Sequence, residues 1–268
     1  MLKVLVVENN PVILKIIFSH LEKEGCEVLT AIDGLAALNI LDSIRPNILF
    51  ADLIMPRVSG DQLCGIIRRD NYLKDIFIAI HSATILEYEQ QMIDIGADVY
   101  IAKGPKINLK AHVLHVLKQY KNGIRRSQEI PGREGLFARE ITKELLLVRK
   151  HYHTIFNSIA EAVVEMDGTG QIVQANLASV RILRKEAHLL LSSNLKDYIS
   201  GPGAKDAVNW INQAGRSQSQ KFTSSYDNPL LVKNRKILLN MVAVKEDEDI
   251  FIIGILQDFL IYAWQRRI

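Results

Sequence analysis

The sequence predicts two folded parts: an α/β domain with a doubly wound, five-stranded parallel sheet and, after a connecting helix, a smaller α+β domain. Short apolar runs alternate with helical stretches over the first 120 residues, which is the pattern of repeated βα units. A length of 268 residues and a hydrophobic content of 48% suit two separate cores. The five expected strands cover residues 2–7, 27–31, 47–51, 76–80 and 98–101.

The boundaries of the first helices are marked by capping residues. Asn10 can cap the first helix, Pro11 suits its first position and Gly25 can end it. The next two helices are expected to open at residues 33–34 and 60–61, where an Asp and a Gly are adjacent. Apolar side chains recur at helical spacing within the first helix, at Ile13, Ile16, Ile17 and Leu21.

Polar side chains follow the strands at the points where the strands end. Asp52 comes directly after the apolar run 47–51 and begins a loop that contains Pro56 and Gly60. Ligand chemistry in open α/β sheets lies at the carboxyl ends of the strands. We therefore expect Asp52 to be a reactive group in a cleft. The polar residues that follow the other strands and would share this cleft are Glu8, Asn9, Ser82 and Lys103.

On these residues, positions 1 to about 120 resemble the receiver domain of a two-component response regulator, which has a flavodoxin-like fold. The resemblance implies that Asp52 accepts a phosphoryl group from a histidine kinase and that Lys103 and Ser82 contact this group. It further implies that Ser82 and Tyr100 act together as a switch. The Mg²⁺ ligands that it implies are Glu8, Asn9, Asp52 and the backbone carbonyl of Ile54.

The chemistry explains why cations are needed beside Asp52. A carboxylate attacks a negatively charged phosphoryl group poorly unless positive charge neutralises the transferring oxygens. Lys103 and Mg²⁺ would supply that charge, and Mg²⁺ accepts a few protein oxygens together with water. We therefore expect a phosphoacceptor that assists its own phosphoryl transfer and is not otherwise an enzyme.

Two positions depart from the family pattern. The family normally has Asp where this chain has Asn9, so the site lacks one formal charge. We expect weaker Mg²⁺ binding and slower phosphoryl transfer or loss as a result. The family usually has Pro directly after the Lys, whereas Lys103 is followed by Gly104 and only then by Pro105. The usual geometry of that loop is therefore not assured.

A polar, Gly-containing stretch separates the two predicted domains. We assign residues 1–120 to the α/β domain, 121–136 to a linker, 137–160 to a helical connector and 161–268 to the second domain. The linker's basic residues are more consistent with a solvated segment than with a nucleic-acid patch. These residues are Arg125, Arg126, Arg133 and Arg139.

The connector carries an apolar seam with alternating spacings of four and three residues. The seam is shorter than the three or four heptads that identify a coiled coil. Two interpretations stay open: packing of the helix on its own domain and, slightly favoured, pairing with the same helix of a second copy in a homodimer. The seam residues are Ile141, Leu145, Val148, Tyr152, Ile155 and Ile159.

The second domain has the element order ββ, helices, βββ. A hairpin turns at residues 167–170, Asn176 starts a helix, a further helix covers 204–214, and strands are expected near 218–227, 235–245 and 250–260. With the preceding helix around 151–159, this order resembles a PAS domain. The resemblance implies a domain that binds haem, flavin, a small metabolite or only another protein.

No cofactor is evident in the PAS-like domain, and its cofactor-binding residues are unknown. His188 is the only His of the domain proper, and the region around 204–214, where a haem ligand would be expected, has none. No Cys follows Cys64, so a photoactive flavin is not indicated. One apolar set could line a ligand pocket or form a packed core, and we favour the core. Its members are Met166, Ile172, Val180, Leu183 and Trp210.

Composition narrows the remaining functional classes. Cys26 and Cys64 form no CxxC pair, which argues against disulfides and structural zinc. No apolar run could span a bilayer and no signal-peptide pattern is present, so we expect a cytoplasmic protein without a membrane partner. A net charge of +3 is too small to imply nucleic-acid binding by itself.

The combined prediction is a response regulator of a two-component phosphorelay. Its partners would be a cognate histidine kinase, a second copy of itself and another regulatory protein. Phosphorylation would draw Ser82 toward the phosphoryl group, let Tyr100 turn inward and bias pairing of the connector helix.

Two alternatives remain. One is a DNA-binding transcriptional regulator that lacks a helix-turn-helix, which a salt-dependent gel shift would support. The other is a ligand-sensing PAS protein with a degenerate receiver scaffold, which a chromophore bound to the purified protein would support.

Overall fold

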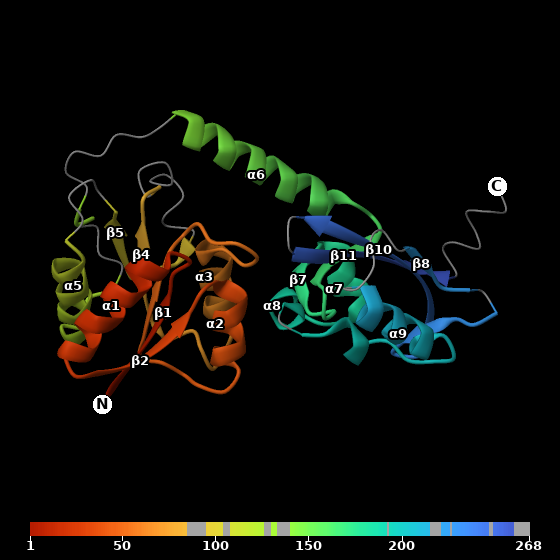
Figure 1. Cartoon of the computed structure of the whole chain (residues 1–268), viewed down its shortest axis with the longest axis horizontal. Coiled ribbons are helices and arrows are strands. Elements are labelled where there is room, and N and C mark those ends of the chain that lie inside the picture. Colours follow the sequence, from red (N-terminus) through yellow and green to blue (C-terminus); the bar gives the residue numbers. More distant parts are fainter. Residues whose placement is uncertain are drawn as a thin grey trace. The chain divides into compact units, whose positions relative to one another are not determined.

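The computed structural model describes residues 1–84, 95–103, 108–125, 130–132, 140–191, 193–214, 221–225, 227–246 and 249–259. The chain divides into two compact units, Met1–Val148 and Arg149–Ile268 (Figure 1). Some sequence predictions fall outside what is described: residues 104–105 and 260–268, Arg126, Arg133 and Arg139, and the side chains of Ile141, Leu145 and His188.

The first unit is a five-stranded, all-parallel sheet with the strand order β2-β1-β3-β4-β5. Helices α1 and α5 lie on one face of the sheet, and α2 and α3 lie on the other (Figure 1). The doubly wound α/β fold predicted from the sequence is therefore confirmed. The elements are β1 Leu2–Val7, α1 Pro11–Lys23, β2 Cys26–Ala31, α2 Gly34–Leu41, β3 Ile48–Ala51, α3 Gly60–Arg69, β4 Phe77–Ser82, β5 Val99–Ala102 and α5 Leu109–Lys121.

The caps of this unit follow the signals in the sequence. The Asn10 side chain accepts hydrogen bonds from the backbone N–H groups of Val12 and Ile13 at 3.0 and 3.2 Å, and thereby caps α1. At the start of α3, a Cβ on Gly60 would lie 2.1 Å from the Asp52 carbonyl oxygen. Glycine is thus needed where α3 begins, because the helix approaches the loop after β3 so closely.

One hydrophobic core lies between the sheet and the helices α1 and α5. Every other residue of each strand points into it, and the apolar stripe of each helix covers it. Its buried members include Val6, Ile17, Phe50, Ile101 and Val113. Packing in this core fixes the position of each strand, and therefore the positions of the residues that follow the strand ends.

The second unit is an antiparallel sheet with the strand order β7-β6-β11-β10-β8, with β9 paired to β10. The predicted order of elements is confirmed, with one addition and one difference: β9 was not predicted, and β8 has three residues where 218–227 was expected. The elements are α6 Glu140–Ser158, β6 Ala162–Asp167, β7 Ile172–Ala175, α7 Leu177–Leu183, α8 Ala187–Leu190, the 3-10 helix η1 Leu195–Asp197, α9 Ala204–Ala214, β8 Lys221–Thr223, β9 Leu230–Val232, β10 Arg235–Glu246 and β11 Asp249–Asp258.

The apolar set considered as a ligand pocket lies in the core of this unit. Met166, Ile172 and Leu183 are fully buried members of one continuous hydrophobic cluster, and Val180 and Trp210 pack against it. This is the placement expected of a packed core.

Buried Asn176 joins three elements of the second unit. Its side-chain oxygen accepts hydrogen bonds from the backbone N–H groups of Val163 and Ser179, both at 3.0 Å. Its amide nitrogen donates to the carbonyl oxygens of Phe156 and Glu161 at 3.3 and 2.8 Å. The residue predicted to start a helix therefore also attaches the end of α6 to the sheet.

The connector is helical, as the seam predicts, over α6. Among its described side chains, Val148 and Ile155 are 64% and 63% exposed, and Tyr152 is also exposed. These three seam positions are exposed in the part of the chain that the structure describes, which favours pairing with a partner helix over packing on the chain's own domain. None of the helices described is both long and apolar enough to cross a membrane.

Candidate phosphoacceptor site

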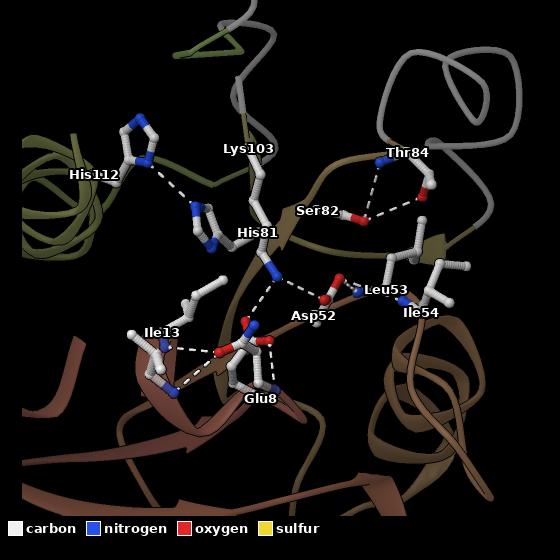
Figure 2. Close-up of polar contacts among 12 residues, drawn as sticks. Glu8, Ile13, Asp52, Leu53, Ile54, His81, Ser82, Thr84, Lys103 and His112 are labelled. Carbon is white, nitrogen blue, oxygen red and sulfur yellow. Dashed lines mark hydrogen bonds and ion pairs between the residues drawn. The ribbon is translucent and has the colours of Figure 1, made fainter. Parts of the chain in front are cut away.

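Three charged residues from distant parts of the sequence meet at the carboxyl ends of the strands in the first unit. The Lys103 ammonium donates to Oε2 of Glu8 at 2.7 Å and to Oδ2 of Asp52 at 2.6 Å (Figure 2). The side chains of Lys103, Glu8 and Asp52 are only 7%, 3% and 11% exposed. Charge-assisted hydrogen bonds are strong in such a poorly solvated pocket. The structure therefore brings these three predicted residues into direct contact.

The Asp52 carboxylate is held from both sides. Its Oδ1 accepts hydrogen bonds from the backbone N–H groups of Leu53 and Ile54, at 2.6 and 3.3 Å, while its Oδ2 accepts from Lys103. The Asp52 amide donates to the carbonyl oxygen of Val7 on the neighbouring strand at 3.0 Å. The carboxylate is thus preorganised, with the Ile54 backbone beside it.

The Glu8 carboxyl group is buried next to this pair. Burial raises the pKa of Glu8 above its ordinary value, and the positive charge of Lys103 opposes that rise. Its Oε1 accepts a hydrogen bond from the Asn10 backbone N–H at 3.1 Å. Asn9, the next residue after Glu8, is exposed at the end of β1.

Glu8 and Asp52 bring two carboxylates to this edge, which are oxygen ligands of the kind that Mg²⁺ takes together with water. Glu8 follows β1 and Asp52 follows β3, and these strands are paired neighbours, so both carboxylates belong to one site. Within the described ranges, no group of three or more His, Cys, Asp or Glu side chains could hold a metal ion. Asn9 would provide an amide oxygen to such a site, which is a hard but neutral ligand.

The two switch candidates are both buried. The Ser82 hydroxyl lies 3.1 Å from the Thr84 hydroxyl and accepts from the Thr84 backbone N–H at 3.3 Å (Figure 2). Burial raises the pKa of the Tyr100 phenol, whose residue is only 7% exposed. The inward turn that we predicted for Tyr100 would therefore not begin from an exposed ring.

Sequence reasoning missed a pair of histidines behind Lys103. His81 is fully buried on β4, and its Nε2 lies 3.2 Å from Nδ1 of His112 on α5 (Figure 2). Burial lowers the pKa of His81 well below its ordinary value, and the charges of Lys103 and His112 lower it further. The signal in the sequence was a titratable residue directly after the apolar run 76–80.

Buried His81 predicts how the free energy of unfolding of the first unit depends on pH. Because the pKa of His81 is lower in the folded than in the unfolded chain, the unfolded chain binds the proton first as pH falls below about 6.5. The free energy of unfolding of the first unit should therefore decrease from pH 7.5 to 5.5, by up to about 1.4 kcal/mol per pH unit for each such group. Urea unfolding should show a smaller pH dependence for His81→Leu than for the unaltered chain, and His20→Leu on α1 is the control substitution. Equal slopes in all three proteins would contradict the prediction.

Comparison with known proteins assigns a family to each of the two domains. Residues 4–113 match the family profile of the response regulator receiver domain, and residues 150–259 match that of the PAS fold. PilG of Pseudomonas aeruginosa is 36% identical over 103 residues, which cover 38% of this chain and 76% of PilG. RpaA of Synechocystis, a DNA-binding dual master transcriptional regulator, is 28% identical over 130 residues, or 48% of this chain and 52% of RpaA. The heme response regulator HssR of Staphylococcus aureus is 31% identical over 121 residues, or 45% of this chain and 53% of HssR.

The chain spans about half the length of RpaA and HssR. Among solved structures, the receiver domain of the Francisella response regulator 1452 covers 46% of this chain and 99% of its own, with 26% identity and a TM-score of 0.42. Together, the receiver match and the extensive coverage of PilG show that this chain belongs to the response regulators, with a receiver domain followed by a PAS domain.

Proposed function

We propose that the chain is a phosphorylation-controlled switch: Asp52 accepts a phosphoryl group from a histidine kinase, and the modified receiver promotes pairing of α6 and its PAS domain with those of a second copy. The observation that carries the proposal is the buried contact of Lys103 with both Asp52 and Glu8. It supports a site in which the Asp52 carboxylate reacts and the Lys103 ammonium is already positioned beside it. The chain would act as phosphoacceptor, not as an enzyme on other substrates.

The reaction forms a bond between an Asp52 oxygen and phosphorus while the bond between phosphorus and the donor's histidine nitrogen breaks. Lys103 can follow the charge, because its ammonium already contacts Oδ2 of Asp52 and needs only to shift to a phosphoryl oxygen. Mg²⁺ would supply further positive charge during the transfer, and the groups that would hold it are Glu8, Asn9, Asp52 and the Ile54 carbonyl.

The hydroxyl of Ser82 would report the modification to the sheet. In this structure its hydrogen-bond partner is Thr84, and a phosphoryl oxygen would be a stronger, charged acceptor. The Ser82 carbonyl also accepts from the Lys103 backbone N–H at 2.9 Å, so the ends of β4 and β5 are coupled. A shift of Ser82 and Lys103 would move both strand ends and, with β5, the buried Tyr100.

The output would be a homodimer. Exposed Val148, Tyr152 and Ile155 form an apolar stripe on α6 that a second α6 could cover. Because a parallel pair of helices places equivalent residues opposite each other, the same stripe serves both copies.

The first test is intact-mass detection of a phosphoryl adduct after incubation with a small-molecule phosphodonor. We expect one adduct on the unaltered chain in the presence of Mg²⁺, little without it, and none on Asp52→Ala. Asn9→Asp should form the adduct faster, because it adds the missing charge to the metal site. A folded, unaltered chain that forms no adduct, or an adduct that persists in Asp52→Ala, would refute the assignment.

The output is read from the same samples by sedimentation velocity. The phosphodonor should increase the dimer fraction of the unaltered chain. The double substitution Val148→Glu and Ile155→Glu should leave a monomer that still accepts phosphoryl, while the control His151→Glu, on exposed surface of the same helix, should still dimerise. A phosphorylated chain that remains monomeric would remove the dimer from the proposal.

A further inference from the structure

The edge strand of the receiver sheet has a partner from the linker. β5 is the last strand in the sheet order, so one of its edges has no neighbour among the strands that the structure describes. The buried amide of Ala102 nevertheless donates a hydrogen bond to the carbonyl oxygen of Pro131 at 2.9 Å. Because an unpaired buried N–H costs about 1–3 kcal/mol, this contact favours the seated position of residues 130–132.

The position of residues 130–132 on the edge of β5, called the seat below, requires glycine at position 132. Its φ is +81°, and a Cβ at this position would lie 2.3 Å from the Ala102 carbonyl oxygen and 3.1 Å from Nε2 of His112. The backbone of the linker therefore lies directly against both the edge strand and the His112 ring. A side chain at position 132 would be strained by its backbone conformation and would also collide with β5.

Packed groups connect this seat to the phosphoacceptor pocket. His112 contacts His81, and the charge of Lys103 acts on His81. Nδ1 of His81 is buried without a hydrogen-bond partner among the residues that the structure describes. The position of the His81–His112 pair therefore depends on close packing. Few hydrogen bonds would keep the two rings in place if Lys103 moved.

The backbone provides a second connection. The Ala102 N–H is bonded outward to Pro131, while the next amide, that of Lys103, is bonded inward to the Ser82 carbonyl. The same two residues thus hold the linker on one side and the pocket on the other. A displacement that reaches the Lys103 backbone would strain both hydrogen bonds.

We propose that residues 130–132 form a linker clamp that is seated on β5 and His112 while Lys103 is paired with Asp52, and that is released when Asp52 carries a phosphoryl group. This inference rests on the proposed function and explains how phosphorylation of Asp52 could affect α6. The clamp lies between the receiver and α6 in the sequence, so its release would free residues 130–132 ahead of the pairing helix.

The test is hydrogen exchange, measured by mass spectrometry on the full chain, of peptides that cover Val99–Ala102. In the unphosphorylated protein, Gly132→Ala should increase exchange of the Ala102 amide about tenfold or more, the equivalent of at least about 1.4 kcal/mol. Gly123→Ala is the matched control: its φ is +66°, but a Cβ there meets nothing within 4 Å. This control should leave the exchange of Ala102 unchanged.

The phosphodonor provides the second arm. It should increase Ala102 exchange in the unaltered chain and add little in Gly132→Ala. Equal protection of Ala102 in Gly132→Ala and the unaltered chain would show that the seat does not exist. If mass spectrometry confirms the adduct but Ala102 exchange does not increase, phosphorylation does not release the clamp. The proposed function would not be affected by that result. A failure to form any adduct would overturn the proposed function and the response together, while the Gly132 arm still decides whether the seat is present.

Discussion

Lys103→Met is expected to destabilise the first unit by about 3 kcal/mol at pH 7.5, because the substitution leaves the buried carboxylates of Glu8 and Asp52 without their shared cation. The methionine retains most of the apolar stem, so packing changes little. Loss of the cation also removes the charge that opposes the raised pKa of Glu8. A raised pKa stabilises the fold below the unfolded-state value and loses this effect as pH rises through the folded-state value. The difference between Lys103→Met and the unaltered chain should therefore shrink toward pH 5.

Urea unfolding followed by circular dichroism measures this difference. Both tryptophans, Trp210 and Trp264, belong to the second half of the sequence. The tryptophan fluorescence transition should therefore stay unchanged in Lys103→Met, and this is an internal control for the second unit. The matched substitution is Lys3→Met, because Lys3 pairs with Glu27 at 3.5 Å with both side chains well exposed. It should cost less than about 1 kcal/mol. Similar losses from both substitutions would show that the Lys103 contacts contribute little.

Asn176→Ala should have an effect of similar size in the second unit. The substitution removes the side-chain partner of the partly buried Val163 N–H and of the Phe156 and Glu161 carbonyls, while the Ser179 N–H keeps the Asn176 backbone carbonyl as an acceptor at 3.0 Å. Because each unsatisfied buried group costs about 1–3 kcal/mol, we expect a loss of about 3 kcal/mol or more. Tryptophan fluorescence during urea unfolding should detect it.

The control for this substitution is Asn157→Ala. Asn157 accepts one hydrogen bond, from the Leu177 backbone N–H at 3.2 Å, at an exposed position. Its removal should cost about 1 kcal/mol or less. If the two asparagine variants unfolded at the same urea concentration, the buried network would not be what attaches α6 to the sheet.

The parallel sheet and the meeting of Glu8, Asp52 and Lys103 were predictable from the sequence for one physical reason. Buried parallel strands read as continuous apolar runs, and their carboxyl ends lie at one edge of the sheet, so polar residues that follow them must converge. The pattern did not show that Lys103 contacts both carboxylates, because a flexible side chain of this length can reach several partners.

The features that were missed depend on long-range contacts or on weak local signals. Strand β9 has only three residues, and the turn after it uses left-handed Lys233 and Asn234 without a glycine. The His81–His112 pair joins a strand to a helix 31 positions later. The seat of Pro131 on Ala102 is a backbone contact, which side-chain patterns do not report.

The contacts of Lys103 also bear on how the receiver folds. They join residues that are 95 and 51 positions apart in the chain, and they connect β5 to β1, with which it is not paired. Contacts between such distant positions close large loops and form late, because loop-closure entropy must be overcome first. During synthesis, Asp52 leaves the ribosome well before Lys103 does. Under the proposed function, the carboxylate would therefore become competent for phosphorylation only when the last strand has docked. A nascent or partly folded receiver would present Asp52 to a kinase without the cation that the reaction requires.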